Sequence, residues 1–277
     1  QQQLRGKRVA IGGAGGVGGV HLLTLARLGV GAFTLADMDR FEPANFNRQV
    51  GAMMSTVGQE KVSVMAQMLR DINPDVNLRL FKDGITAANV DDFLQDADLY
   101  LDALDFFAFD ARQAVFAACE RRKIPAISVA PLGMGASLIC FLPGHMGFEQ
   151  FFGFGKATDA EKALRFLVGL APKAVHMRYL VEPQRIDLAK RKGPSTCMSV
   201  QLCAGVAGVE ALKILLGRGR VRAAPYTMTF DAYLGRLVVA WRPWGHRNPL
   251  TQFTLFWARR ALRQRLRASA DAVRDAA

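Results

Sequence analysis

A glycine-dense turn follows directly after a short apolar run near the start of the chain. The run from Val9 to Ile11 predicts a buried strand, and the next residues read GGAGGVGG before a helical pattern begins. Gly13, Gly15 and Gly18 match the spacing G-x-G-x-x-G, and Gly16 lies inside it. Glycine permits positive φ angles and close approach of backbone N–H groups to an anion, and a helix N-terminus favours negative charge. The turn therefore predicts a phosphate-binding site, although the motif alone does not choose between NAD(P) and ATP.

Short apolar runs alternate with helical patterns over roughly the first 140 residues. The expected strands are 9–11, 32–36, 77–81, 97–101 and 126–129, and the expected helices are 21–28, 63–72 and 111–121. A helix between two strands carries the chain back to the end where the first strand began, so such strands pair in parallel. The sequence therefore predicts an α/β fold with a Rossmann-like, doubly wound, mostly parallel sheet.

The rest of the chain continues the same domain and ends in a helix. Further strands are expected at 137–141, 226–230 and 236–241, and helices at 160–170 and 198–216. We expect a nucleotide-binding half at 1–145 and a second half at 146–241 with a crossover loop at about 171–197. A basic amphipathic helix is expected within 242–277, with Leu255, Leu262, Leu266 and Val273 on one face.

Composition narrows the class of protein. The 277 residues are 51% apolar, which is enough for a large core. No apolar run approaches the roughly 20 uninterrupted residues that span a bilayer, and no signal-peptide pattern opens the chain, so we expect a cytoplasmic protein. The four cysteines form no C-x-x-C pair, so no zinc is expected. Because the first residue is Gln1 and not Met, we expect further sequence upstream.

Positive charge is concentrated at the end of the chain. The net charge is +12, and the stretch from Trp241 onward holds eight arginines against two aspartates, half of the total. Such a tail favours an acidic partner, although a basic helix face that is simply solvated is the simpler interpretation. Nucleic acid is disfavoured. The last helix is expected to pack on its own domain or on a second subunit, with contact to a membrane surface as the alternative.

The residues after the second expected strand favour ATP over NAD(P). Asp37 lies 19 residues past Gly18, where a carboxylate can accept hydrogen bonds from ribose hydroxyls in either nucleotide. The chain then continues DMDRFEPANFNRQ, followed by GQEK ending at Lys61. A dinucleotide needs little extra positive charge, whereas a triphosphate attacked at its α-phosphorus is neutralised by an arginine fork and a lysine.

This pattern, D-x-D-x-x-x-x-x-N-x-x-R-Q, then G-x-x-K, then a strand ending in an aspartate, resembles the ThiF/MoeB group of the ubiquitin-activating (E1-like) superfamily. The resemblance covers roughly residues 9–216. It implies a Rossmann-like sheet with an E1-like C-terminal extension of antiparallel strands. It also implies a homodimer that uses ATP and Mg²⁺ to adenylate a carboxylate, often at the C-terminus of a ubiquitin-like or sulfur-carrier protein or of a peptide.

The resemblance also implies roles for individual residues. Arg48, Lys61 and Asp105 would be catalytic, with Lys61 against the α-phosphate and Asp105 as the Mg²⁺ ligand. The remaining nucleotide contacts would come from the turn and the loop that follows the second strand: Gly13, Gly15, Gly16 and Gly18 around the nucleotide, Asp37 on the ribose, Asn45 with Arg48 on the phosphates, and Gln49 bracing the loop. Each of the charged residues also has a simpler interpretation, namely a solvated surface residue or a helix cap.

The sequence departs from the family pattern in three places. Phe106 follows Asp105 where the family usually has Asn, the paired C-x-x-C motifs are absent, and the family's arginine-containing N-terminal segment would lie before Gln1. Cys197, in the sequence PSTC at a helix start, is a candidate thioester nucleophile. The family's cysteine falls near Lys190, however, so a small apolar helix-entry residue is the alternative.

The sequence thus predicts an ATP-dependent adenylyltransferase. Two alternatives remain open. One is an NAD(P)-dependent oxidoreductase, in which Arg48 and Lys61 would have no role. The other is a non-catalytic E1-like scaffold, which predicts that the residues of the ATP site have been lost.

Overall fold

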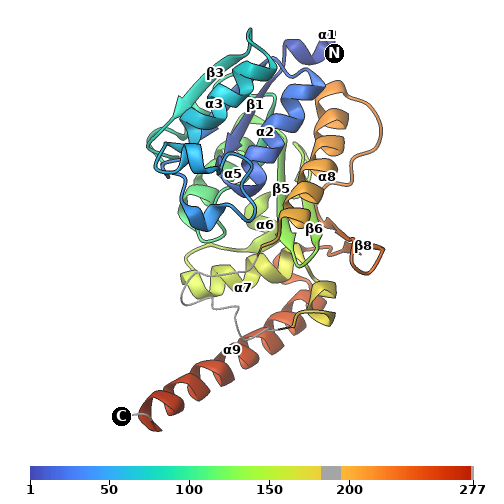
Figure 1. Ribbon diagram of the computed structural model, residues 1–277. Helices are drawn as coiled ribbons and strands as arrows, with labels where there is room; N and C mark the ends of the chain where they lie inside the picture. Colours follow the sequence, from blue (N-terminus) through green and yellow to red (C-terminus); the bar gives the residue numbers. More distant parts are fainter. Residues whose placement is uncertain (182–194, 276–277) are drawn as a thin grey trace.

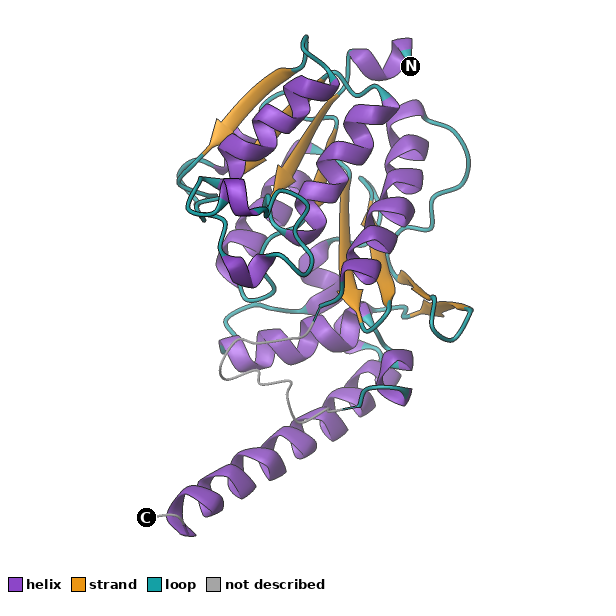
Figure 2. Cartoon of the chain, viewed as in Figure 1, coloured by secondary structure: helices purple, strands orange, loops and turns teal. Residues whose placement is uncertain are grey.

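Eight strands form one sheet in the order β3-β2-β1-β4-β5-β6-β7-β8 (Figures 1 and 2). The computed structural model describes residues 1–181 and 195–275, with side chains described up to Leu262 and at Gln264. The strands β3, β2, β1, β4 and β5 pair in parallel, and β6, β7 and β8 add antiparallel pairs. The strand bounds are β1 Arg8–Gly12, β2 Ala32–Ala36, β3 Asn77–Phe81, β4 Leu99–Asp102, β5 Ala126–Leu132, β6 Gly135–Phe141, β7 Tyr226–Asp231 and β8 Arg236–Trp241. The predicted doubly wound, mostly parallel sheet with a later antiparallel part is confirmed.

Helices cover both faces of the sheet (Figure 1). On one face α2, α3 and α8 pack against alternate strand residues such as Val9 and Ile11. On the other face, residues of α4, α5, α6 and α7 join Ala10 and Tyr100 in a second, phenylalanine-rich core. The helix bounds are α1 Gln2–Arg5, α2 Gly16–Leu28, α3 Lys61–Ile72, α4 Val90–Phe93, α5 Phe109–Arg122, α6 Phe148–Phe152, α7 Asp159–Leu170, α8 Cys197–Leu216 and α9 Pro249–Asp275. Strands buried on both faces read as unbroken apolar runs, which is how they stand out in the sequence.

Helix α8 is long and apolar enough to cross a membrane by length and composition, and half of that stretch is buried in the structure. It packs against α2 and against the strands β5 and β6. Cys203 and Ala207 belong to the same core cluster as the strands. The apolar character of α8 is therefore used by packing at the centre of the fold.

The C-terminal helix differs from the prediction. Leu255 and Leu262 pack with Leu164 and Val168 of α7, as the expected apolar face requires. The side chains of Leu266 and Val273 lie outside the described residues, as does the part of the expected crossover loop at 182–194, which includes Lys190. The opposite side of α9 is apolar as well, because Phe253 and Trp257 are more than half exposed there. The division of the chain at 145 and 241 stays a prediction.

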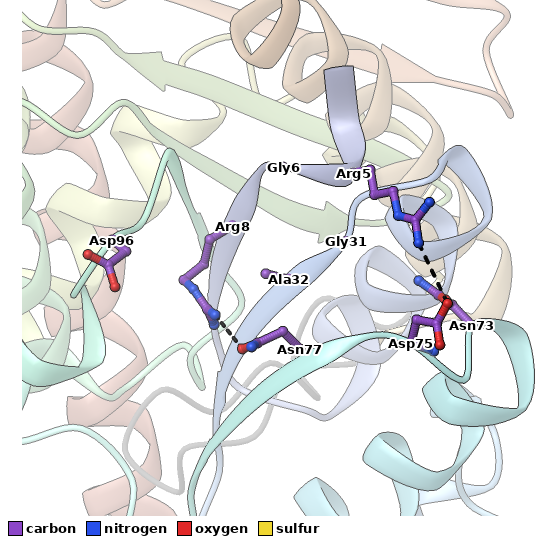
Figure 3. Close-up of a pocket in the computed structure, with 9 residues that line it drawn as sticks. All are labelled: Arg5, Gly6, Arg8, Gly31, Ala32, Asn73, Asp75, Asn77 and Asp96. Carbon is purple, nitrogen blue, oxygen red and sulfur yellow. Dashed lines mark hydrogen bonds and ion pairs between the residues drawn. The ribbon is translucent and has the colours of Figure 1, made fainter. Parts of the chain in front are cut away.

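A cavity of about 350 Å³ lies at the amino ends of β1, β2 and β3 (Figure 3). The buried Arg8 guanidinium donates to the carbonyl of Phe33 at 3.1 Å and to Oδ1 of Asn77 at 2.5 Å. These bonds tie three neighbouring strands together at the end of the sheet opposite the glycine turn. The other lining residues are Arg5, Gly6, Gly31, Ala32, Asn73, Asp75 and Asp96. The positive charge of Arg8 in this cavity thus stabilises the pairing of β1, β2 and β3.

Candidate functional site

The glycine turn joins β1 to α2 with backbone atoms in close contact. Gly13 has φ of +100°, a region that favours glycine, and its N–H donates to the carbonyl of Ala36 at 2.7 Å. A Cβ atom at Gly13 would lie 2.1 Å from the carbonyl oxygen of Ala103, just past β4. A Cβ at Gly18 would lie 1.9 Å from the carbonyl oxygen of Gly13. Only glycine fits at either position. The N-terminus of α2 therefore lies beside the carboxyl ends of β1 and β4.

Asp37 follows β2 and braces the turn from the other side. Its Oδ2 accepts the N–H of Ala14 at 2.7 Å, and its Oδ1 accepts the N–H of Asp39 at 2.9 Å. Burial raises the pKa of Asp37. Each carboxylate oxygen has two lone pairs, so one acceptor direction on each oxygen is left for a ribose hydroxyl.

The loop after β2 folds back over the turn, and Asn45 shapes it. The Asn45 carbonyl accepts the N–H groups of Arg48 and Gln49 at 3.1 and 2.9 Å, and its Oδ1 accepts the N–H of Glu42 at 3.0 Å. Asn45 therefore uses its side chain within the loop and presents the two residues that follow it.

Gln49 and Arg48 lie over the beginning of α2. Gln49 is 7% exposed, its amide lies 3.4 Å from the Cβ position of Gly15, and its Oε1 has no hydrogen-bond partner among the described residues. The Arg48 guanidinium donates to the Ala44 carbonyl at 3.2 Å and to Oδ1 of Asn47 at 2.8 Å. Among the described residues no carboxylate lies within 4 Å of Arg48. A positive charge that no described carboxylate pairs with thus lies beside the glycine turn.

Lys61 opens α3 and has a partner that the sequence reading missed. Its side chain is only 7% exposed, and its Nζ lies 2.8 Å from Oδ2 of Asp39, whose side chain is 61% exposed. The Lys61 N–H also donates to the Asp39 carbonyl at 3.0 Å. The D-x-D pattern could have indicated this partner, because its second aspartate, Asp39, lies two residues past Asp37. The buried ammonium group of Lys61 is thus paired with the exposed carboxylate of Asp39. A phosphate could replace that carboxylate as the partner of the ammonium group.

Asp105 lies in the loop after β4. It is exposed, and its Oδ1 accepts the N–H of Phe107 at 2.9 Å, so it caps a local turn and not α5. In the described part of the chain no group of three His, Cys, Asp or Glu side chains could hold a metal ion. Mg²⁺ is commonly held by one or two carboxylates together with substrate phosphates, and a single exposed carboxylate fits that pattern.

A buried ion pair positions the loop that carries Asp105. The Arg112 Nε lies 2.9 Å from Oδ2 of Asp102, and both side chains are 2% exposed. The same guanidinium donates to the carbonyl oxygens of Leu104, Asp105 and Phe106 at 2.9, 3.0 and 3.1 Å. This geometry gives Asp102 a structural role, and the sequence analysis assigned no role to Arg112.

Cys197 is the first residue of α8, and its side chain is exposed. One turn further on, Val200 lies 3.6 Å from the Cβ position of Gly16, and the Asn47 amide donates to the carbonyl of Ser195 at 3.4 Å. The start of α8 therefore lies beside the glycine turn. The three other cysteines are buried, and burial raises the pKa of each of them: Cys119, Cys140 and Cys203.

The structure thus brings the predicted residues to one end of the sheet. The turn follows β1, Asp37 follows β2 and Asp105 follows β4, at the carboxyl ends of parallel strands where the strand order reverses. Arg48 and Lys61 reach the same place from the loop and from α3. The ThiF family model matches residues 1–251 of the chain. This chain belongs to the ThiF family.

Two curated relatives are similar to the chain over about half of its length. The chain is 34% identical over 143 residues to the sulfur carrier protein ThiS adenylyltransferase of Escherichia coli strain K12, covering 52% of this chain and 56% of the relative. It is 37% identical over 126 residues to the tRNA threonylcarbamoyladenosine dehydratase of the same strain, covering 45% and 46%. In both cases the matched stretch spans about half the length of the relative.

A solved structure of E. coli MccB with ATP is similar in fold. The TM-score is 0.66 at 17% identity, covering 90% of this chain and 67% of MccB. Phe106, which stands where the family usually has Asn, packs against other aromatic rings. Its ring centre lies 6.1 Å from that of Phe109 and 5.4 Å from that of Phe166. The aromatic side chain anchors the Asp105 loop in the second core.

Proposed function

We propose that the chain is an ATP-dependent adenylyltransferase that converts a carboxylate into an acyl-adenylate and releases pyrophosphate. The observation that carries the proposal is the Arg48 guanidinium, which has no ionic partner among the described residues and lies beside the glycine turn. Lys61 adds a second cation on the same side of the sheet. An oxidoreductase that binds NAD(P) gives these two cations no role, and an inactive scaffold gives no reason to keep them.

The chemistry needs charge stabilisation and no general base. A carboxylate is ionised at neutral pH, so its oxygen can form a bond to the α-phosphorus directly while the bond from that phosphorus to the bridging oxygen breaks. Pyrophosphate leaves with the electron pair of the broken bond. Arg48 and Lys61 would hold the phosphate oxygens in place and offset their charge. Asp105 would hold a Mg²⁺ ion, which supplies further neutralisation of the phosphates when bound.

For the substrate we propose the C-terminal carboxylate of a small acidic carrier protein or a peptide. Two findings support this class: one relative is named a sulfur carrier protein adenylyltransferase, and MccB has been solved both with ATP and with MccA. The net charge of +12 favours an acidic partner. A homodimer, implied by the family resemblance, completes the proposal.

Exchange of labelled pyrophosphate into ATP tests the proposal. The assay uses a set of carrier proteins and peptides with free C-termini, and total tRNA as a separate arm, because one relative is named a tRNA-modifying dehydratase. Arg48→Ala and Lys61→Ala should each lower exchange by at least about 100-fold. Lys82→Ala is the control, because that exposed lysine pairs with Glu60 at the outer edge of the loop. Exchange that survives in both Arg48 and Lys61 variants would contradict the assignment of the site.

A further inference from the structure

An exposed apolar stripe runs along the first half of α9. Leu250, Phe253, Phe256 and Trp257 are each between 53% and 64% exposed. Their spacing of three and four residues places them on one side of the helix. The Trp257 ring lies 6.2 Å from that of Phe253 and 5.7 Å from that of Phe256, so three of these side chains already touch one another. We call these four residues the outer stripe.

The outer stripe is not needed to hold α9 on the body. The other side of the helix carries Leu255 and Leu262, which pack on α7, and Arg259 donates from Nε to Oε2 of Glu161 at 3.0 Å. From this contact with α7 the helix runs away from the sheet, and the C-terminus lies at its far end (Figure 1). The stripe is therefore an additional apolar surface that the described residues leave uncovered.

Aromatic exposure is concentrated around the start of this helix. All three tryptophans of the chain are more than half exposed, with Trp241 at 57%, Trp244 at 66% and Trp257 at 53%. Tryptophan is normally highly buried, and a contiguous exposed apolar patch marks an interaction surface.

The charge around the outer stripe indicates an anionic occupant. Helix α9 holds six arginines and two aspartates, a net charge of +4. Glu161 neutralises Arg259, but Arg260, one turn past the aromatic cluster, is exposed and has no described carboxylate within 4 Å. The sequence continues with arginines at 263, 265 and 267. Two copies of this helix packed against each other would bring like charges together, which disfavours a second copy as the occupant.

We propose that α9 is a peripheral membrane anchor that places the outer stripe in the headgroup region of an anionic lipid bilayer. Phenylalanine, tryptophan and leucine beside arginine are the composition of helices that lie in the membrane interface. The arginines bind lipid phosphates while the aromatic rings enter the boundary with the acyl chains. This contact is independent of the nucleotide site, and it does not require any segment to span the bilayer.

Sedimentation with vesicles tests the anchor. The full chain should sediment with vesicles of phosphatidylcholine mixed with phosphatidylglycerol, much less with phosphatidylcholine alone, and less at high salt. The triple variant Phe253→Ser, Phe256→Ser, Trp257→Ser should bind the anionic vesicles at least about tenfold more weakly. A control variant, Met54→Ser with Leu237→Ser, removes two exposed apolar side chains elsewhere, 82% and 63% exposed, and should keep full binding.

A second readout places the contact on α9 itself. With Trp241→Phe and Trp244→Phe, Trp257 is the sole tryptophan, and its fluorescence should shift to the blue on adding anionic vesicles. Absence of binding to anionic vesicles, or full binding by a folded triple variant, overturns the proposal. If Arg260→Glu abolishes binding to anionic vesicles while the triple variant keeps it, the contact depends on charge alone and the anchor is overturned. Concentration-dependent dimers that only the triple variant loses assign it to a second copy.

Discussion

Glycine at positions 13 and 18 allows β1, β4 and α2 to meet at the glycine turn. A Cβ atom at Gly13 would lie 2.1 Å from a backbone oxygen, and one at Gly18 would lie 1.9 Å from another. Both distances are far shorter than a van der Waals contact. A backbone oxygen cannot move aside as a flexible side chain can. The glycines therefore set the distance between β1, β4 and α2, and with it the place where phosphates would bind.

Replacing one of these glycines should weaken the fold itself. Gly18→Ala is expected to lower the free energy of unfolding by roughly 1–3 kcal/mol, because the added methyl group forces the backbone apart. Gly205→Ala is the control, since Gly205 lies exposed in α8 with no atom within 4 Å of its Cβ position. That change should raise the free energy of unfolding by about 0.5–1 kcal/mol. Urea denaturation measures both, and a neutral Gly18→Ala would contradict the account.

At the scale of elements, the Asp102–Arg112 pair couples β4 to α5. Ser128 of β5 completes the network by donating to Oδ2 of Asp102 at 2.8 Å. Arg112 also stacks on the Phe166 ring of α7, with 4.6 Å between the guanidinium carbon and the ring centre. One guanidinium group thus links a strand, two helices and the loop of Asp105.

Removing that guanidinium should cost far more than removing a surface arginine of the same helix. Arg112→Met leaves a buried carboxylate without its cation and is expected to lower the free energy of unfolding by about 3–5 kcal/mol. Arg121→Met breaks only an exposed pair with Asp91 at 3.6 Å and should cost under about 1 kcal/mol. Thermal or urea unfolding compares the two. Similar costs for both variants would show that the network does not anchor the loop.

Sequence patterns predicted the long elements well and the short ones poorly. The strands and the helices α3, α5, α7 and α8 lie where their periodicity placed them, within a few residues. Helix α2 begins at Gly16 and not near His21, because glycines carry no apolar side chain to mark a period. Helices α4 and α6 were missed, since four or five residues are too few for a helical period to appear.

The candidate site was predictable where its residues are close in sequence and not where they meet only in space. The turn, Asp37 and the loop through Gln49 follow one another along the chain. The pairing of Asp102 with Arg112 and Ser128 joins residues 10 and 26 positions apart through the fold. The outer stripe of α9 was missed because an apolar residue reads the same in sequence whether it is buried or exposed.

At the scale of the whole molecule, the two proposed sites lie at different parts of the sheet. Its parallel half carries the nucleotide turn, while the antiparallel half leads through β8 to α9 and its exposed aromatic residues. The two regions share one core, since α8 packs on β5 and β6 and also on α2. The nucleotide site and α9 are thus separate surfaces that are connected through one core.

The stability of the whole molecule should fall in mild acid because of His21. This side chain is fully buried in α2, the described part of the chain offers its Nε2 no hydrogen-bond partner, and burial lowers its pKa to about 4. Between about pH 6.5 and pH 4 the unfolded chain binds a proton that the native protein does not, so stability decreases as the pH falls. The loss amounts to roughly 3 kcal/mol across that window.

Substituting the histidine tests this expectation. His21→Leu should flatten the dependence of the free energy of unfolding on pH between 6.5 and 4, whereas His145→Leu, at an exposed position, should leave it unchanged. His176, whose pKa burial also lowers, contributes in the same direction, so part of the slope should remain in His21→Leu. An unchanged slope in His21→Leu would contradict the assignment.

Calorimetry of nucleotide binding tests the central claim most directly, with ATP and Mg²⁺ compared against NAD⁺ and NADPH, on the wild-type chain and on Lys61→Ala. An adenylyltransferase site predicts selective binding of ATP that weakens at least about tenfold in Lys61→Ala, because a charge-assisted hydrogen bond to phosphate is lost. Selective binding of NAD⁺ or NADPH would contradict the claim and assign the glycine turn to an oxidoreductase, and binding of no nucleotide would assign the chain to a scaffold.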